Sequence, residues 1–224
     1  MKKTIYRCLL AATAVCLASN SMAQTGNEFL GAGAGNGNTT GDYDTYIGDS
    51  AGYINSTGSY NTFLGYRAGY NATNSWDNIF IGADAGYSLT TGVDNTVIGT
   101  RAAVNMTGTD MVIIGTQAGE SLTTGADNVF IGEESGRYHT TGSDCVFLGE
   151  DAGYNNTTAS DNTFLGNNAG RTNTTGYRNT FVGNEAGYDN RDGFWNTAVG
   201  DSAGIDNSDG VGNTMIGHGS GGWF

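Results

Sequence analysis

The chain repeats itself almost without interruption from Asn27 onward. The repeating unit is 17 residues long, with the consensus N-T-F-[IL]-G-x-x-A-G-Y-x-x-T-T-G-x-D. Twelve copies follow one another; the fifth is one residue shorter and the last is partial. The fifth position is glycine in every copy, and the fourth is leucine, isoleucine or valine in every copy. Self-similarity at a fixed period predicts a stack of identical structural units.

The residue pattern within one unit indicates β structure. The unit is too short for a pair of helices and has no apolar spacing of the helical period. It contains a short strand-like run such as Thr62–Leu64, then a glycine turn, a second short segment around Gly69 and a loop rich in Thr, Gly and Asn. We therefore expect an all-β fold, a parallel β-solenoid or β-roll of about twelve coils. Equivalent residues would form columns about 4.8 Å apart, in a rod about 55 Å long.

Two neighbouring positions of each predicted strand are apolar in every copy. The third position is apolar or aromatic, as at Phe63, and the fourth is aliphatic, as at Leu64. Neighbouring side chains of a strand point to opposite faces, so both faces of the predicted sheet are apolar. A free-standing solenoid buries one face only, and one coil dominated by Ala and Gly encloses little volume. We therefore expect a homo-oligomer, with the third-position or the fourth-position column at the contact.

The first 23 residues are typical of a cleaved bacterial export signal. A basic start, Met1–Arg7, precedes a short apolar segment, and Ser21–Ala23 offers a small-x-small cleavage site. We expect residues 1–23 to be a signal peptide and residues 24–224 to be a single β-solenoid repeat domain. No apolar run approaches about 20 residues, so no integral membrane segment is expected after signal removal. The predicted location is secreted or on the bacterial outer cell surface.

The charge balance excludes one large class of partners. Removing the signal leaves six arginines, no lysine and 22 acidic residues, a net charge of 6 − 22 = −16. A chain this acidic is repelled by phosphate backbones and by anionic membrane surfaces. Nucleic acid is therefore not an expected partner.

Motifs of catalytic sites occur as by-products of the repeat. Ser50 and Ser202 each lie in G-x-S-x-G, the nucleophile-elbow pattern, but other copies carry other residues in place of the serine. A catalytic serine also needs a base, and the only histidines are His139 and His218. The stretch Gly217–Gly222 matches G-x-G-x-x-G without a helix to hold a pyrophosphate. We predict no enzymatic activity, no catalytic residues, no cofactor and no metal site.

An aspartate column admits two interpretations. The last position of the unit is aspartate in six consecutive copies: Asp77, Asp94, Asp110, Asp127, Asp144 and Asp161. Turn chemistry, with these carboxylates capping backbone amides, is favoured over a column of calcium ligands.

Threonine, tyrosine and cysteine raise three further questions. Threonine recurs at the second position and at positions 13 and 14 of the unit. The two adjacent threonines point to opposite faces, so we favour a ladder of threonines that stabilises the loop. Ice binding is the alternative. Cys145 stands where most copies have asparagine and is interpreted as a tolerated substitution. Tyrosines at the tenth position suit either sugar stacking or packing between chains. These tyrosines are Tyr53, Tyr70, Tyr87, Tyr154 and Tyr188.

The repeated motif N-T-F-I-G-x-x-A-G-x-x-x-T-T-G resembles the head repeat of trimeric autotransporter adhesins of the YadA type. Similar arrays occur in phage tail-fibre-like and large bacterial surface proteins. The resemblance covers Asn27–Phe224 and rests mainly on the I-G-x-x-A core. It differs in having a longer unit, with no heptad stalk and no C-terminal membrane anchor.

The resemblance implies a left-handed β-roll whose three chains pack side by side into a rigid surface adhesin. Its expected partners are copies of itself and a host matrix, cell surface or solid surface that the sequence does not identify. The alternative is a self-assembling extracellular filament of rods stacked end to end. Trp223 and Phe224 folding over the last coil would block such stacking.

Overall fold

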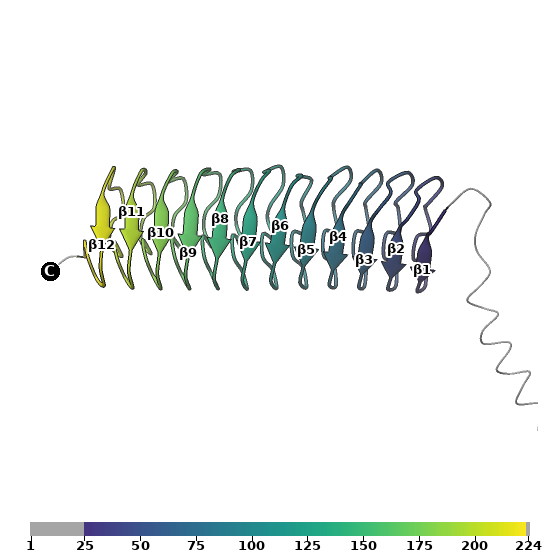
Figure 1. Ribbon diagram of the computed structural model, residues 1–224, viewed down its shortest axis with the longest axis horizontal. Helices are drawn as coiled ribbons and strands as arrows, with labels where there is room; N and C mark the ends of the chain where they lie inside the picture. The colour runs from purple at the N-terminus through teal and green to yellow at the C-terminus, as the bar shows by residue number, and fades with distance from the viewer. Residues whose placement is uncertain (1–24, 223–224) are drawn as a thin grey trace, which may run out of the picture.

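The computed structural model describes residues 25–222, and the expected signal peptide, Trp223 and Phe224 lie outside this range. The described residues form a single rod of stacked coils (Figure 1). This confirms the predicted all-β parallel β-solenoid with a 17-residue repeat. Among these residues, no helix has the length and apolar character needed to cross a membrane. The strands are β1 Glu28–Leu30, β2 Thr45–Ile47, β3 Thr62–Leu64, β4 Ile79–Ile81, β5 Thr96–Ile98, β6 Val112–Ile114, β7 Val129–Ile131, β8 Val146–Leu148, β9 Thr163–Leu165, β10 Thr180–Val182, β11 Thr197–Val199 and β12 Thr214–Ile216.

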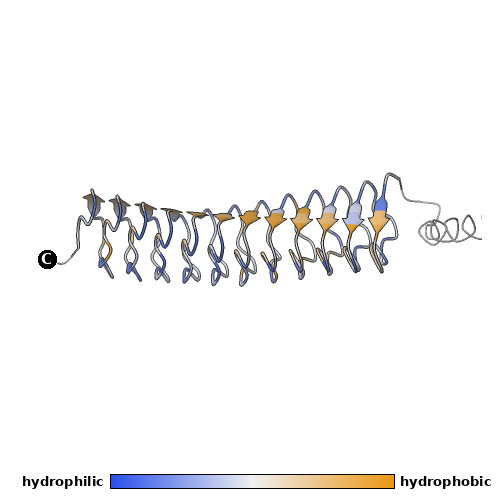
Figure 2. Ribbon diagram, turned by 90° about the horizontal axis from the view of Figure 1, so that it is seen from below, coloured by the Kyte–Doolittle hydropathy of each residue, from blue (hydrophilic) through white to orange (hydrophobic). Residues whose placement is uncertain are grey.

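The strands pair in parallel and in chain order, from β1 to β12, in one sheet. The sheet runs along one side of the rod and the loop segments run along the other (Figure 2). Equivalent residues are direct partners, as Phe63 is to Phe80. The shortened fifth copy keeps this register, since Val97 of β5 lies opposite Ile113 of β6. Its missing residue falls in the loop, where Thr107 is followed directly by Gly108.

The third-position side chains form the core. Neighbouring rings stack with almost parallel planes, and the centroids of Phe63 and Phe80 are 4.9 Å apart at 7°. Eighth-position alanines such as Ala68 and twelfth-position side chains such as Leu89 and Leu122 fill the remaining space. One coil encloses little volume by itself, as expected, but the stacked rings of successive coils close the core within a single chain. The buried members of the column are Tyr46, Phe63, Phe80, Val97, Ile113, Phe130, Phe147, Phe164, Phe181 and Ala198.

The ninth-position glycine makes room for the ring of its own coil. Gly69 has φ +59°, and a Cβ there would lie 2.6 Å from a ring carbon of Phe63. The one alanine at this position, Ala103, adopts φ 47° in the coil whose third residue is the smaller Val97. An aromatic third residue is therefore always accompanied by glycine at the ninth position, although glycine also accompanies the smaller Ile113 and Ala198.

This coupling can be tested in the fifth coil. We expect Val97→Phe to lower the free energy of unfolding by about 1–3 kcal/mol, because the new ring overpacks against Ala103. Adding Ala103→Gly should recover most of that loss, because the double variant has the same ring and glycine as the fourth coil, Phe80 and Gly86. Thermal unfolding followed by far-UV circular dichroism measures both, with Ala103→Gly alone as the control. Equal stability of Val97→Phe and the wild-type protein would contradict the coupling.

A buried asparagine ladder joins the coils at the first position of the unit. The Oδ1 of Asn61 accepts a hydrogen bond from the backbone N–H of Asn78 at 3.2 Å. The Nδ2 of Asn78 donates to the carbonyl of Gly92 at 3.0 Å. Each amide thus satisfies buried backbone groups of two coils, as a packed interior requires.

Cys145 occupies one rung of this ladder, and its backbone N–H still donates to Oδ1 of Asn128 at 2.9 Å. Burial raises the pKa of its thiol to about 12. It is the free cysteine of the described chain. Its interpretation as a tolerated substitution stays a prediction, and the retained backbone bond is consistent with it.

Candidate functional site

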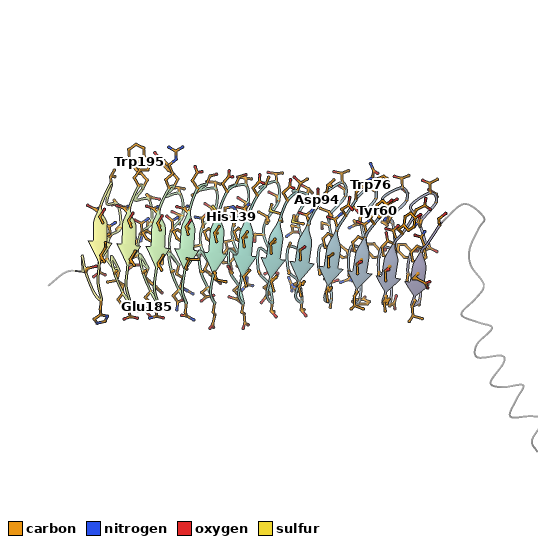
Figure 3. The ribbon with its side chains drawn as sticks, in the orientation of Figure 1. Tyr60, Trp76, Asp94, His139, Glu185 and Trp195 are labelled. Atoms are coloured by element: carbon orange, nitrogen blue, oxygen red, sulfur yellow. The ribbon has the colours of Figure 1, made fainter. Side chains whose placement is uncertain are left out.

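Three surfaces run along the rod, each formed by fixed positions of the unit. The sheet face comprises the second and fourth positions. The tyrosine–arginine edge comprises the seventh and tenth positions, and the aspartate edge comprises positions 13 to 17. Figure 3 shows Tyr60, Trp76, Asp94 and Trp195 along one long edge and Glu185 along the opposite one.

The sheet face is almost uncharged, with an aliphatic column at the fourth position beside a column rich in threonine and valine at the second. Because alternate residues share a face, the fourth-position side chains point outward while the third-position rings point inward. Leu64 is 43% exposed and Leu148 is 44% exposed. The second-position residues beside them are mostly threonine and valine, and Glu28 is the one charged residue in the two columns. Of the two candidate contact columns, the fourth position is thus the accessible one.

On the tyrosine–arginine edge the tenth-position side chains stack on their neighbours along the chain. The rings of Tyr53 and Tyr70 are 5.1 Å apart, and those of Tyr70 and Tyr87 are 5.2 Å apart. Further along, the guanidinium of Arg171 lies 4.8 Å from the centroid of Tyr154 and 5.9 Å from that of Tyr188. These tyrosines stack on one another within one chain. The sequence suggested two other roles for them, sugar stacking and packing between chains, and both stay predictions.

The arginines of this edge are paired with carboxylates. Nε of Arg67 is 2.8 Å from Asp84, and this pair raises the pKa of the guanidinium. Glu120 bridges two arginines, Arg101 and Arg137. Between the columns lie shallow hollows of about 380 Å³ and 320 Å³. The larger is lined by Asp151, Asn168, Arg171, Glu185, Tyr188 and Ile205.

The two G-x-S-x-G serines sit at the seventh position in a left-handed conformation, with φ 58° at Ser50 and 54° at Ser202. Asp201 lies between Ser202 and His218. Its Oδ2 is 3.5 Å from Oγ of Ser202 and 3.0 Å from Nδ1 of His218. A catalytic triad needs the histidine between the serine and the acid, and here the acid lies in between. In the described chain no hydrogen bond joins Ser202 to His218.

His139 lies in the core, away from these serines. Its Nε2 is 2.9 Å from the carbonyl of Gly142, and its Nδ1 is 2.8 Å from Oδ1 of Asn156. Burial lowers the pKa of this imidazole and keeps it neutral. The third motif, Gly217–Gly222, continues the twelfth coil beyond β12.

On the aspartate edge, all six predicted aspartates are exposed and left-handed, with φ from 55° at Asp77 to 61° at Asp161. Aspartate is among the residues that adopt this conformation most readily. The aspartates therefore lie in turns, as expected, but the predicted capping is wrong, because no backbone amide of the described residues donates to these carboxylates. Within residues 25–222, no group of three or more His, Cys, Asp or Glu residues could hold a metal ion.

The thirteenth-position threonines form the predicted loop-stabilising ladder. Oγ1 of Thr73 donates to the carbonyl of Thr90 at 3.0 Å, and Oγ1 of Thr140 donates to that of Thr157 at 2.8 Å. These hydroxyls bond to the next coil. The second-position threonines instead lie on the sheet face, and ice binding stays an untested alternative.

The aspartate edge also carries two exposed aromatic clusters that sequence reasoning did not single out. The first consists of the stacked Tyr43 and Tyr60 with the exposed Trp76 on the next coil, and the second of the exposed Tyr177 and Trp195 with the half-buried Phe194 between them in the sequence. The signal was present in the sequence, because these residues replace the small or acidic residues of the last two repeat positions.

Comparison with known proteins finds no family model that matches the chain, no similar curated protein and no similar solved structure. The likeness to adhesin head repeats therefore rests on the repeated residues alone.

Proposed function

We propose that the protein is a secreted or cell-surface structural protein of the adhesin type, without enzymatic activity, whose rods associate with copies of themselves. The observation that carries this proposal is the apolar sheet face on a rod whose core is already closed. Exposed contiguous apolar surface marks an interaction site.

Charge directs the association to this face. Copies of a chain with a net charge of −16 repel one another over most of their surface. The sheet face is the strip where charge is almost absent. A strip three residues wide and twelve strands long covers about 550 Å². Two such strips facing each other would bury about 1,100 Å², close to the lower limit for a specific interface.

Three copies around an axis use this narrow strip better than two. In a face-to-face pair the long edges of each strip stay open to water. Three strips around an axis shield one another's edges, and sheets pack about 10 Å apart, which matches the strip's width. A trimer is also what the resemblance to adhesin head repeats implies.

Light scattering of the mature protein at high micromolar concentration tests this proposal. We expect a mass of three chains, falling to that of one chain in the double variant Leu64→Asp, Leu148→Asp. The control is Thr91→Asp, Thr124→Asp, which adds the same charge to exposed loop positions and should remain a trimer. A monomer mass for the wild-type protein, or equal masses for both variants, would reject association through the sheet face.

A further inference from the structure

Three bulky aromatic residues occupy a backbone conformation that does not suit them. Tyr43, Tyr60 and Trp195 have φ of 58°, 62° and 59°, at the position where six other coils carry aspartate. Left-handed backbone is unfavourable for large side chains, and strain of this kind concentrates at functional sites. The side chains are 51%, 54% and 54% exposed, so burial does not offset that strain. These residues make the fold less stable than the aspartate that other coils carry at the same position. Their presence at that cost points to a role in binding.

The second cluster exposes an indole across two stacked rings. Tyr177 and Phe194 stack with centroids 5.0 Å apart at 3°. The plane of Trp195 lies at 77° to both rings, with centroids 6.4 Å and 5.3 Å away. Arg178, also exposed, lies beside Tyr177 and pairs with Asp161 at 3.4 Å. The cluster thus combines accessible aromatic surface with hydrogen-bonding groups at its rim.

The first cluster lies on the same edge near the other end of the rod (Figure 3). Tyr43 and Tyr60 stack at 5.2 Å, and Nε1 of Trp76 donates to Oδ1 of Asn74 at 3.1 Å. Eight coils separate Tyr60 from Trp195 in column order, a distance of about 38 Å at the strand spacing. The coils between them carry the aspartate column.

We propose that the two aromatic clusters bind one neutral polysaccharide chain along the aspartate edge. This names a ligand class for the proposed adhesin and rests on that role. Each cluster has only three aromatic side chains, far fewer than the roughly 20–30 residues of a specific protein interface. Aromatic surface with polar groups beside it suits sugar rings, which have apolar C–H faces and hydroxyl rims.

The charge between the two clusters and the distance that separates them further restrict the class of ligand. The aspartate column between the clusters repels acidic polymers, so a neutral chain fits this edge better. A ligand that contacts both clusters must extend about 38 Å, which a polymer does and a small sugar does not. Occupying both clusters makes the second contact intramolecular and raises the overall affinity.

Affinity electrophoresis of the full mature chain in native gels tests the proposal, with hydroxyethyl cellulose, galactomannan, dextran and anionic alginate as probes. We expect at least one neutral polymer to retard the protein. Trp195→Asp and Tyr60→Asp each install the residue that six coils carry in the same backbone conformation, so folding is retained. Each change should weaken the apparent affinity about tenfold, and the double variant should lose retardation.

Tyr138→Ser is the matched control, since it removes an exposed tyrosine outside both clusters and should leave retardation unchanged. No retardation by any neutral polymer, retardation by alginate alone, or equal retardation of the double variant and the wild-type protein would each overturn the proposal. Light scattering of the double variant separates this result from the proposed trimer, because neither substitution lies on the sheet face.

Discussion

Replacing Gly115 with alanine is expected to abolish folding of the solenoid or to lower its free energy of unfolding by more than about 4 kcal/mol. Gly115 has φ +145°, and a Cβ there would lie 2.1 Å from the carbonyl oxygen of Gly132 in the next coil. That oxygen is backbone and cannot rotate away. The coil spacing cannot open either, because ladder bonds such as Gly115 N–H to the carbonyl of Ile98 at 2.8 Å hold it.

The twelfth coil supplies a matched control. Gly217 occupies the same position with φ +116°, but a Cβ there would meet nothing within 4 Å. Gly217→Ala should therefore cost only the conformational strain, about 1–3 kcal/mol. Urea unfolding followed by far-UV circular dichroism compares the two variants. Similar losses would show that backbone conformation, and not contact between coils, explains the invariant glycine.

The invariant glycine also shows how much of the fold can be predicted from the sequence. A period of 17 residues with glycine at one fixed position predicts stacked coils, because so short a unit cannot bury a core alone and stacking places every copy in an equivalent environment. Strands such as Thr62–Leu64 follow from their composition. Which face of the strand points into the core could not be predicted in this way. Phe63 and Leu64 are both apolar, and alternation shows only that their side chains point to opposite faces. The space left by Gly69 decides it, and the pairing of Val97 with Ala103 was a readable sign of that contact.

The candidate site was less accessible to sequence reasoning, because a consensus describes what the copies share. The aspartate column was found, but its left-handed backbone is a property of the folded turn. The tyrosine column was found too, although a sequence does not tell whether Tyr70 stacks on Tyr53 or on another chain. The aromatic clusters were missed because Tyr60 and Trp195 are departures from the consensus. In a repeat protein the shared residues build the rod, and the exceptions are where a site for one ligand can arise.

Asp44 is such an exception in the core, and replacing it with asparagine is expected to stabilise the protein above pH 6. It stands on a rung of the asparagine ladder and is fully buried. Its Oδ1 accepts from the backbone N–H of Asn61 at 2.9 Å and its Oδ2 from Nδ2 of Asn38 at 3.2 Å. Burial outweighs these bonds and raises the pKa of the carboxyl from 3.8 to about 6.

The direction of the pH effect follows from proton binding. Between pH 3.8 and about 6 the folded protein holds a proton on Asp44 that the unfolded chain has lost. The stability contributed by Asp44 is therefore fully present below pH 3.8 and is lost as the pH rises through about 6. The gap between the two pKa values sets the cost of burying the ionised carboxylate at neutral pH at no more than about 3 kcal/mol.

Asp44→Asn removes that cost and restores the amide of the ladder. In the variant, the new amide would face Asn38, six residues earlier in the chain. The rod already contains a pair of asparagines at this spacing, because Nδ2 of Asn196 donates to Oδ1 of Asn190 at 3.3 Å. We expect a gain of about 1–3 kcal/mol at pH 7 that shrinks on acidification and disappears near pH 4. Thermal midpoints from pH 4 to 8 measure it. Asn128→Asp should show the opposite dependence, and the exposed Asp127→Asn should show no comparable gain. Parallel pH profiles for Asp44→Asn and the wild-type protein would mean that folding does not change the pKa of Asp44, and would contradict the cost assigned to its burial.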